Sequence, residues 1–566
     1  MNKKLFLTLF LTTISLNIIA QNLKFEWAKQ FKGSEANNGY SLVADKMGNV
    51  YSTGFFNGTV DFDPDTSKTF LITSKGIFNS YLSKLDANGK FKWAINLGEK
   101  NSNSALSIAL DQFGNSYITG FYRGTVDFNP GSQEYNLTSK GEADVFISKI
   151  DSSGNFVWAT SFGGLQIDAP KMISVDNSNN FYVVGSFKGL VDFDPSSIEQ
   201  NINSNGKEDI YITKFNSNGS LIWIKTMGSI DTDIANCIAV DHKNNVIISG
   251  TFSEEIDIDP NNGVNLFSTK GQKDGFICKL DSQGVFKWAK TISGKLDITP
   301  SSIAIDKEDN IITTGYFEDT AFFYPNKFLK SSNNSVDIFI YKTNSNGDFV
   351  WTNKIGGDLG DYAHSIAVDK LNDIYITGGF QGISDFDPSQ NEFNLTARGD
   401  DDLLIAKYSQ SGALVWAKNM GYEYGSCYGQ NIFVDEIGNI YTTGAFSMSI
   451  DFNFEDDEEY ILTFNQGSEI YLNKISQPDF NTNIRNIKNV VLKFDVFPIP
   501  SSGKCQIHSD FLGKISIINQ LGEIVKSFEI TNKINDLDLS EFNNGIYYII
   551  GYSKNSMIRE KIIISK

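Results

Sequence analysis

Apolar and polar residues alternate in short runs along most of the chain, which is the pattern of half-buried β-strands. Residues 144–151 alternate in this way, and a second run at 156–158 follows Gly154. Runs of this kind, bounded by Asp, Asn and Gly, predict strands that are joined by tight hairpins. Because no helical period competes with the alternation, the sequence predicts an all-β protein.

The tryptophans divide the chain into repeats. All seven fall on one grid, with successive spacings of 66, 65, 65, 65, 63 and 65 residues. Each interval contains four predicted strands: one of the type Ile-Ala-Val-Asp, one of the type Tyr-Ile-Thr-Gly, one with a recurrent lysine and one with the tryptophan. Such a unit, repeated radially, indicates a β-propeller. The tryptophans are Trp27, Trp93, Trp158, Trp223, Trp288, Trp351 and Trp416.

The two ends of the repeat region predict how the ring closes. Seven sets of the first three strands occur, and the last set ends near Ile475 with no tryptophan after it. A spare tryptophan strand, residues 23–28, precedes the first set. We therefore expect a seven-bladed β-propeller over residues 21–477 that is closed by the N-terminal strand, which removes exposed sheet edges.

The strand sequences also carry a family resemblance. Ile-Ala-Leu-Asp occurs at 108–111, Ile-Ala-Val-Asp at 366–369 and Tyr-Ile-Thr-Gly at 375–378. Over about residues 22–477 these units resemble the SBBP-type β-propeller repeat family, with NHL-like strand sequences. The resemblance implies the propeller fold and no particular activity, because one fold hosts many functions.

The lengths of the connections distinguish the two faces of the predicted propeller. Turns between the first and second strands, as at 45–49, and between the third and fourth strands, as at 86–89, are short. These turns share one face, here named the tight-turn face. The connections at the opposite, long-loop face are extended, for instance 381–401 and 421–430. Long loops on a rigid scaffold commonly carry function, so we expect the ligand site at the long-loop face.

Most of the long connections after the second strand contain the motif Asp-Phe-Asp-Pro or a close variant; the fifth replaces it with Phe-Phe-Tyr-Pro at 322–325. In an extended segment the two acids point one way and the Phe the other. Two carboxylates with loop carbonyls could hold Ca²⁺, which would be the one cofactor. Alternatively, the acids cap backbone amides and fix a turn. The candidate calcium ligands are Asp61, Asp63, Asp127, Asp192, Asp194, Asp257, Asp259, Asp385 and Asp387.

Other candidates depart from the repeat pattern. An acidic triplet begins at residue 400, and an acidic run covers 455–459 on the adjacent predicted blade. These acids form either a solvated rim or a patch for a cation or a basic partner. One histidine precedes the first strand of the sixth predicted blade, near the long-loop face. The binding candidates are Asp400, Asp401, Asp402, Asp456, Asp457 and His364.

Repeated residues are interpreted as structural. One Trp per unit at a fixed strand position favours packing between blades over stacking on sugar rings. The recurrent lysine is expected to lay its stem along a neighbouring blade and to pair with an acid such as Asp144 or Asp209. Cys237 and Cys278 fall in one repeat, so they either pair or remain buried thiols.

Composition narrows the function. Lys+Arg is 48 and Asp+Glu is 67, so the formal net charge of −19 disfavours nucleic-acid binding. No nucleophile elbow, zinc motif or phosphate loop occurs, and the chain has only three histidines. We expect a monomeric, non-enzymatic binding or scaffold module for an extracellular glycan or protein. The alternative is a secreted enzyme that cleaves polysaccharide or peptide.

The N-terminus predicts export. Lys3 and Lys4 precede an apolar run at 5–19, and the small residue Ala20 ends the segment. This order is that of a secretory signal peptide, here residues 1–20. No later run of 18 apolar residues occurs, so we expect no transmembrane segment in the mature chain.

The C-terminus forms a separate predicted domain. Residues 478–492 contain Pro, Asp and several Asn, as a linker does, and residues 493–566 contain short alternating runs that predict a small β-sandwich. Phe-Pro-Ile-Pro-Ser-Ser-Gly at 497–503 and Leu-Gly-Glu-Ile-Val at 521–525, with the terminal Lys-Ile-Ile-Ile-Ser-Lys, resemble the type A C-terminal sorting domain of the type IX secretion system of Bacteroidota. The resemblance implies Sec export, passage through the outer membrane with the type IX machinery as partner, and either release or attachment at the cell surface.

Overall fold

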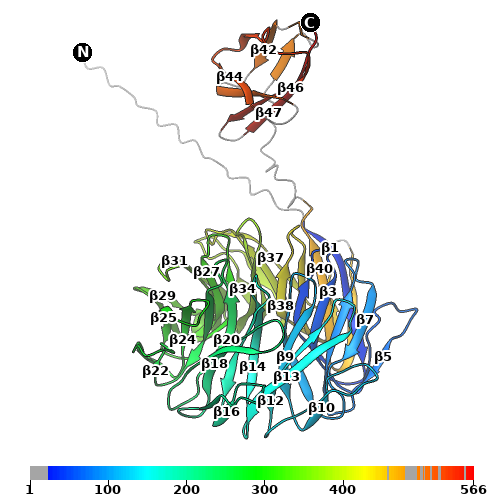
Figure 1. Cartoon of the computed structure of the whole chain (residues 1–566), viewed down its shortest axis with the longest axis vertical. Helices are drawn as coiled ribbons and strands as arrows, with labels where there is room; N and C mark the ends of the chain where they lie inside the picture. Colours follow the sequence, from blue (N-terminus) through cyan, green and yellow to red (C-terminus); the bar gives the residue numbers. More distant parts are fainter. Residues whose placement is uncertain are drawn as a thin grey trace, which may run out of the picture. The chain divides into compact units, whose positions relative to one another are not determined.

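The structure is a computed structural model, and it describes residues 23–455, 458–478, 494–497, 501–502, 504–509, 513–519, 524–553 and 556–566. The predicted signal peptide and nearly all of the predicted linker lie outside these ranges. The chain divides into two compact units, Met1–Pro478 and Asp479–Lys566 (Figure 1). Apart from one 3-10 turn, Ser332–Asn334, every regular element of the described residues is a β-strand, which confirms the all-β prediction. In the same residues we find no helix long and apolar enough to cross a membrane.

The first compact unit is built from antiparallel sheets that share a four-stranded arrangement, each named here by its first strand. In the described residues, the β8, β20, β26 and β38 sheets are extended to six strands by a two-stranded hairpin. Within each sheet, neighbouring strands are hydrogen-bonded in chain order, and the last sheet adds the N-terminal strand β1 to β40. The strands are β2 (Asn38–Ala44), β3 (Val50–Phe56), β6 (Asn79–Leu85), β7 (Phe91–Asn96); β8 (Asn103–Leu110), β9 (Ser116–Tyr122), β12 (Asp144–Ile150), β13 (Phe156–Gly164); β14 (Ala169–Val175), β15 (Phe181–Phe187), β18 (Asp209–Phe215), β19 (Leu221–Met227); β20 (Ile234–Val240), β21 (Val246–Phe252), β24 (Asp274–Leu280), β25 (Phe286–Gly294); β26 (Ile298–Ile305), β27 (Ile311–Glu318), β30 (Val336–Thr343), β31 (Phe349–Gly357); β32 (Asp361–Val368), β33 (Ile374–Phe380), β36 (Asp402–Tyr408), β37 (Leu414–Met420); and β38 (Ser426–Val434), β39 (Ile440–Asp451), β40 (Ile461–Ser476), β1 (Lys24–Gly33).

The N-terminal strand joins the end of the repeat region, as the spare tryptophan strand predicts. Strand β1 pairs antiparallel with β40, in a register that runs from Lys24 opposite Ser476 to Phe31 opposite Ile470. In Figure 1 the blue strand β1 accordingly lies beside the orange strand β40. This pairing connects the first and last segments of the unit and covers one edge of β40.

The first strands of successive sheets contact one another in a cycle. β2 contacts β8, and the series continues through β14, β20, β26 and β32 to β38, which contacts β2 again. The hydrophobic core lies between neighbouring sheets: Tyr51 and Leu82 from the β2 sheet pack with Ile118 and Phe146 from the β8 sheet. Burial of such side chains contributes about 1.5–3 kcal/mol each, so the seams between sheets carry most of the stabilising contacts.

The long connections after the second strand form short hairpins. Where the first strand of a hairpin continues a sheet, it pairs with the last strand of the preceding sheet, as β16 does with β13. The β1–β4, β25–β28 and β31–β34 pairings follow the same rule. The hairpins are β4 (Thr59–Asp61) with β5 (Leu71–Thr73), β10 (Thr125–Asp127) with β11 (Asn136–Thr138), β16 (Leu190–Asp192) with β17 (Asn201–Asn203), β22 (Glu255–Asp257) with β23 (Leu266–Ser268), β28 (Thr320–Phe323) with β29 (Lys327–Lys330), and β34 (Ile383–Asp385) with β35 (Asn394–Thr396).

The second compact unit contains two small sheets. One has the order β41-β42-β45 and the other β44-β43-β46-β47. Side chains of both sheets, such as Ile507 and Leu537 from one and Ile515 and Ile549 from the other, share one core. The strands are β41 (Phe494–Phe497), β42 (Lys504–Ser509), β43 (Gly513–Ile518), β44 (Ile524–Ile530), β45 (Ile534–Asp538), β46 (Gly545–Ser553) and β47 (Ser556–Ile564).

Candidate functional site

Each tight turn between a first and a second strand is organised by an aspartate. In the β2–β3 turn, Asp45 Oδ1 accepts the backbone N–H groups of Met47 at 3.0 Å and Asn49 at 2.9 Å, and Oδ2 accepts the Asn49 side-chain amide at 2.8 Å. This side-chain-to-backbone pattern fixes a tight turn. The same acceptance of backbone N–H groups recurs at Asp111, Asp176, Asp241, Asp306, Asp369 and Asp435.

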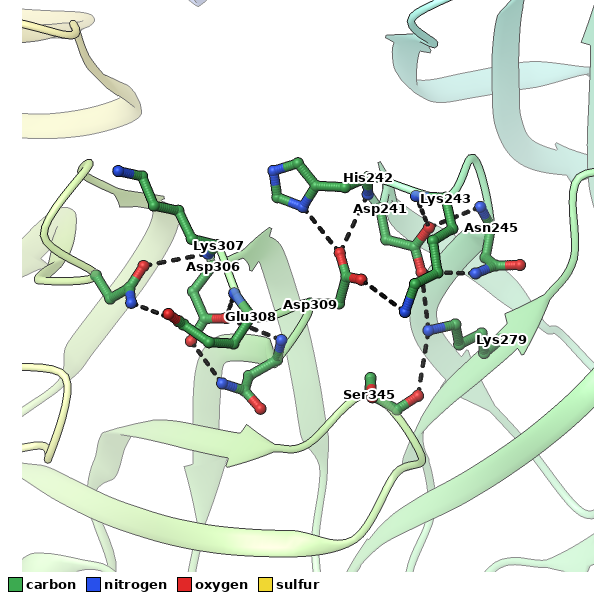
Figure 2. Close-up of polar contacts among 12 residues, drawn as sticks. Asp241, His242, Lys243, Asn245, Lys279, Asp306, Lys307, Glu308, Asp309 and Ser345 are labelled. Atoms are coloured by element: carbon green, nitrogen blue, oxygen red, sulfur yellow. Dashed lines mark hydrogen bonds and ion pairs between the residues drawn. The ribbon is translucent and has the colours of Figure 1, made fainter.

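The recurrent lysine joins each turn to the next sheet. Lys279 Nζ lies 2.9 Å from Asp241 Oδ2 and donates to the Ser345 carbonyl at 3.1 Å (Figure 2). Four equivalent lysines reach the same two kinds of partner, an aspartate of their own sheet's turn and a carbonyl of the next sheet: Lys84, Lys149, Lys214 and Lys342. The expected pairing with Asp144 or Asp209 is wrong. Both of those acids lie at the start of a third strand, at the opposite end from the lysine ammonium, and accept backbone N–H groups instead.

The tryptophans also connect neighbouring sheets. Trp288 Nε1 donates to the Ser345 carbonyl at 3.2 Å, the atom that also accepts from Lys279. Trp223 and Trp351 make the equivalent bonds to Ser282 and Gln410. The indoles therefore pack between neighbouring sheets, in agreement with the sequence prediction.

A cavity of about 710 Å³ opens at the tight-turn face, between the turns of the neighbouring β38, β2, β8 and β14 sheets. Three of these turns place a large apolar side chain in the lining: Met47, Phe113 and Ile437, which are 76%, 69% and 56% exposed. Exposed apolar side chains gathered at a cavity mark a binding surface more often than isolated ones do. Lys46 and Glu436 add opposite charges to the same lining.

Only part of the tight-turn face is apolar. The position of Met47 in its turn is occupied by Ser178, Lys243 and Glu308 in the β14, β20 and β26 sheets, whereas Leu371 of the β32 sheet is apolar and 40% exposed. The four apolar residues thus come from four consecutive sheets around the contact cycle. The polar residues come from the remaining three consecutive sheets. The exposed apolar side chains at the cavity are therefore not a feature that every repeat shares.

On the polar side, ion pairs tie adjacent turns together. His242 Nδ1 lies 2.8 Å from Asp309 Oδ1, and Lys243 Nζ lies 3.2 Å from Asp309 Oδ2 (Figure 2). Burial alone would raise the pKa of Asp309, but the hydrogen bonds from His242 and Lys243 bring it below its ordinary value. The polar side chains of this half of the face pair with one another, in contrast to those of the apolar half.

Loop length alone indicates a ligand site at the long-loop face. A different signal was available at the tight turns. The third position of each turn can be aligned across the repeats, and it is apolar only in four consecutive units. This departure from the repeat pattern would have directed attention to the tight-turn face.

The acids of the Asp-Phe-Asp motifs close their own loops. Asp385 Oδ1 accepts the N–H groups of Asp387 at 3.0 Å and Phe393 at 2.8 Å, and Asp387 Oδ1 accepts the Ser389 N–H at 2.9 Å. Phe386 between them is buried against Phe380, as expected from strand alternation. The first acid of the other motifs bonds in the same way: Asp61, Asp127, Asp192 and Asp257.

These contacts agree with the interpretation of the acids as turn-forming residues. Each loop uses at least one carboxylate oxygen for backbone N–H groups, and Asp192 also pairs with Lys140 at 3.0 Å. Among the residues that the structure describes, no group of three or more His, Cys, Asp or Glu side chains is placed to hold a metal ion. Calcium binding at Asp61, Asp63 and their equivalents stays a prediction.

The acidic triplet also supports a loop. Asp401 accepts the Gln381 side-chain amide at 2.8 Å and the Ser426 hydroxyl at 3.1 Å, and Asp402 is buried, where it accepts the Arg398 N–H at 3.0 Å. Asp400 is exposed and donates its backbone N–H to the Gly425 carbonyl at 2.9 Å. Asp456 and Asp457 lie outside the described residues.

His364 joins two sheets. It lies in β32, and its Nδ1 donates to the Gly429 carbonyl of β38 at 3.0 Å, while its ring meets the edge of Tyr428. Burial lowers the pKa of His364, and the bond to Gly429 opposes that effect. In the described residues His364 makes no hydrogen bond or ion pair with the triplet at 400–402. Binding by these four candidates stays a prediction.

Buried carboxyl groups at the long-loop ends of the strands are a feature that the sequence analysis did not single out. Burial raises the pKa of Asp168, Asp361 and Glu469 to about 7 each. Asp168 accepts the N–H groups of Gly164 at 2.7 Å and Lys188 at 3.2 Å. These contacts close loops at the seams. Their sequence signal is an acid directly before or at the start of a predicted strand.

The cysteines are unpaired. Cys237 and Cys278 are buried free thiols, and the same holds for Cys427 and Cys505. The thiol of Cys237 faces the Ser249 carbonyl at 3.7 Å and that of Cys278 the Ile258 carbonyl at 3.8 Å. Of the two alternatives left open by the sequence, the structure has the buried thiols.

Comparison with known proteins identifies the C-terminal segment. Residues 495–565 match the family described as secretion system C-terminal sorting domain. The chain is therefore exported by the type IX system. Its destination is the cell surface or the extracellular space, and the sorting domain is the part that engages the secretion machinery.

The chain also has more distant relatives. It is 23% identical over 487 residues, 72% of this chain and 34% of the relative, to an uncharacterized WD repeat-containing protein of Acanthamoeba polyphaga mimivirus. It is 25% identical over 206 residues, 35% of this chain and 20% of the relative, to the regulatory protein FlaEY of Caulobacter vibrioides. The chain thus spans about a third and a fifth of the lengths of these two curated relatives.

Solved structures show weak likeness. PorZ, described as an essential bacterial surface component of the type IX secretion system of Porphyromonas gingivalis, is 9% identical, with 95% of this chain and 100% of that chain covered and a TM-score of 0.23. A Bacteroides caccae protein of unknown function is 10% identical, with 65% and 93% covered and a TM-score of 0.28. Scores this low identify neither a shared fold nor a shared function.

Proposed function

We propose that the chain is a secreted binding module, built as a seven-bladed β-propeller, that holds a segment of an extracellular protein in the cavity of the tight-turn face. The single observation that carries the proposal is the cavity of about 710 Å³ lined by the exposed side chains of Met47, Phe113 and Ile437. The SBBP-type assignment of the repeats belongs to the same proposal.

Three features support seven closed blades. Seven four-stranded sheets can be counted in the described residues when β1 is assigned to the sheet of β38, β39 and β40. Their first strands contact one another in a cycle, and the pairing of β1 with β40 joins the two ends of the region. A closed ring of this kind holds the turns of different blades in fixed relation, which favours binding over mobility.

A protein segment fits the cavity better than a glycan does. The exposed apolar residues of the lining are mainly aliphatic, and Phe113 is the one aromatic ring among Met47, Phe113 and Ile437. Apolar anchors with a few charged groups at the edge, here Lys46 and Glu436, are the usual composition of a protein-binding site. The lining also contains hydrogen-bonding side chains, such as Gln112, Asn177 and Asn179, so the preference for a protein segment rests on the exposed apolar anchors.

The lining offers little to a hydrolase. Its aspartates, such as Asp45 and Asp111, each accept two backbone N–H groups of their own turn and face the recurrent lysine of the seam. A catalytic pair of carboxylates needs one group that is available to the substrate. The enzymatic alternative therefore has no specific observation in its favour at this cavity.

The test is a selection of random-sequence peptides, displayed on phage, against the full chain. Peptides are then compared on a variant with Met47→Ser, Phe113→Ser and Ile437→Ser. We expect the selected peptides to be rich in apolar residues and to bind the variant at least about tenfold more weakly, because hot-spot anchors dominate such interfaces.

A control variant with Leu190→Ser and Ile198→Ser, two exposed residues of the β16–β17 hairpin segment, should bind the peptides as the unmodified chain does. Selection of no peptides, or of peptides that bind the triple variant equally well, would refute the proposal. Because all five substituted side chains are exposed, the fold of either variant should be unaffected.

A further inference from the structure

The hairpin β28–β29 differs from the other inserts. At Phe322-Phe323-Tyr324 it carries aromatic residues where the others carry Asp-Phe-Asp or the close variants Asp-Phe-Asn and Asp-Ile-Asp. Phe323 keeps the structural role of the central Phe, since it is buried against Phe339 and Tyr341. Phe322 and Tyr324 take the places of the two acids, so the turn-closing contacts of the other inserts are replaced by exposed rings.

Three aromatic side chains are exposed on this hairpin. Phe322 lies directly opposite Phe328 in the β28–β29 pairing, with ring centroids 6.5 Å apart. Phe322, Tyr324 and Phe328 are 39%, 53% and 66% exposed. β29 is the last strand of its six-stranded sheet, so the rings lie at an open edge. Exposed rings grouped in this way mark a contact surface rather than core packing.

Two lysines lie over these rings, and a third belongs to the hairpin itself. Lys290 Nζ lies 4.4 Å from the centroid of Tyr324, and Lys270 Nζ lies 5.5 Å from that of Phe322. Lys327 is the first residue of β29, and its Nζ lies 6.0 Å from the centroid of Phe349 in β31. None of the three lysines makes an ion pair with a carboxylate of the described residues. The nearby Asp319 is engaged by Lys295 at 3.4 Å and by the Thr320 hydroxyl at 2.7 Å.

The three lysines carry a charge opposite to that of the whole chain, which has a formal net charge of −19. Lys270 interacts electrostatically with Asp274, but none of the three lysines is held in an ion pair. Lysines placed in this way raise the local concentration of anionic partners, and the acidic remainder of the chain repels such partners elsewhere. Lys270 and Lys290 hold cation–π positions over Phe322 and Tyr324, from which an incoming carboxylate can displace them.

We propose that the aromatic–lysine face, formed by Phe322, Tyr324, Phe328, Lys270, Lys290 and Lys327, binds an anionic extracellular polysaccharide of the uronic-acid class. The apolar C–H faces of pyranose rings pack on aromatic rings, and their carboxylates pair with the ammonium groups. Rings exposed along a narrow two-stranded edge suit a polymer that runs past it. This site is separate from the tight-turn cavity and does not depend on the peptide ligand there.

The test uses the full chain and polygalacturonate as the probe, with dextran as the neutral polymer, in affinity electrophoresis or biolayer interferometry. The unmodified chain should bind polygalacturonate and not dextran, and added salt should weaken the binding. Phe322→Ala with Phe328→Ala, and separately Lys270→Ala with Lys290→Ala, should each weaken binding about tenfold or more. The Leu190→Ser, Ile198→Ser variant should bind as the unmodified chain does.

Three results would overturn the proposal: no binding of polygalacturonate, binding that both double variants retain, or equal binding of polyglutamate. The last result would assign the face to an acidic protein partner. Unchanged melting temperatures of the variants establish that the fold is intact. Retained binding of the selected peptides by these variants distinguishes failure at this face from failure of the tight-turn cavity.

Discussion

At the scale of single residues, one set of polar contacts recurs at the boundaries between neighbouring sheets. An aspartate caps its own tight turn, and a lysine from the third strand joins that aspartate to the next sheet. Lys279, Asp241 and the Ser345 carbonyl are an example, and the Lys279 and Asp241 side chains are nearly inaccessible to solvent. A buried charge with all its partners in place contributes little net stability, but removal of one partner is costly.

Replacement of Lys279 by Met should therefore destabilise the chain by roughly 3–5 kcal/mol, because it leaves the Asp241 carboxylate buried without its cation. Lys287→Met, which removes an exposed lysine paired with Asp281 at 3.0 Å, should change stability by at most about 0.5 kcal/mol. Denaturant unfolding of both variants measures the difference. Equal effects of the two substitutions would contradict the role given to the seam lysine.

The buried carboxyl groups predict a pH dependence. Burial raises the pKa of Asp168 to about 7 from an ordinary value near 3.8. Folding therefore favours the protonated form, so the stabilisation is complete below about pH 4 and is lost as the pH rises through about 7. Between these limits the folded state should lose about 4 kcal/mol of stability relative to low pH, because the change in pKa from 3.8 to about 7 is worth about 1.4 kcal/mol per pH unit.

Asp168→Asn, which places here the residue that stands at the equivalent Asn103, should reduce the loss of stability between pH 4 and pH 8. Urea unfolding at several pH values gives the slope. Asp231→Asn, at an exposed acid whose pKa is lowered by hydrogen bonds from Lys207, should leave the slope in this window unchanged. An Asp168→Asn variant with the slope of the unmodified chain would refute the assignment.

At the scale of elements, the pairing of β1 with β40 is the decisive contact. It joins segments more than 400 residues apart and satisfies the edge of β40. The seam is reinforced by Glu469, which is buried and accepts the Gly33 N–H at 2.6 Å and the Asn37 side-chain amide at 3.0 Å. An unpaired edge at this position would be a site for pairing with another chain.

A chain without residues 21–33 should accordingly lose several kcal/mol of stability, on the order of that for the loss of a core element, and should self-associate through β40. A synthetic peptide of residues 23–33 added in trans should restore the melting temperature by strand addition, and a scrambled peptide should not. Size-exclusion chromatography and thermal unfolding check both effects. A truncated monomer that melts as the full chain does would contradict ring closure by β1.

At the scale of the whole molecule, the two compact units have different tasks. The sorting domain directs export, and the repeat unit presents its turns outside the cell. Deletion of residues 495–566 should leave the chain inside the cell envelope, because the segment that engages the secretion machinery is lost. Immunodetection in the medium, at the cell surface and in the periplasm measures this. Release of the truncated chain in normal amount would refute it.

The sequence predicted the strands well for a physical reason. Burial of one strand face imposes the alternation of apolar and polar residues. Packing between neighbouring sheets imposes the regular spacing of the tryptophans. Both patterns can therefore be recognised from the sequence. The partner of the recurrent lysine could not be predicted in this way. Asp144 lies close to Lys149 in sequence, but only the strand direction shows that Asp111, at 3.7 Å, lies at the lysine's end. The cavity was missed since loop length, rather than the side chains at Met47, Phe113 and Ile437, was taken as the guide.

Hydrogen–deuterium exchange of the full chain, with and without the tightest selected peptide, locates the peptide on the molecule. A peptide held in the tight-turn cavity should slow the exchange of backbone amides at 45–49, 111–115 and 435–439, with no change at 306–310 on the polar side of the same face. Protection confined to the long-loop connections, such as 381–401, would contradict the assignment of the binding site to the tight-turn cavity.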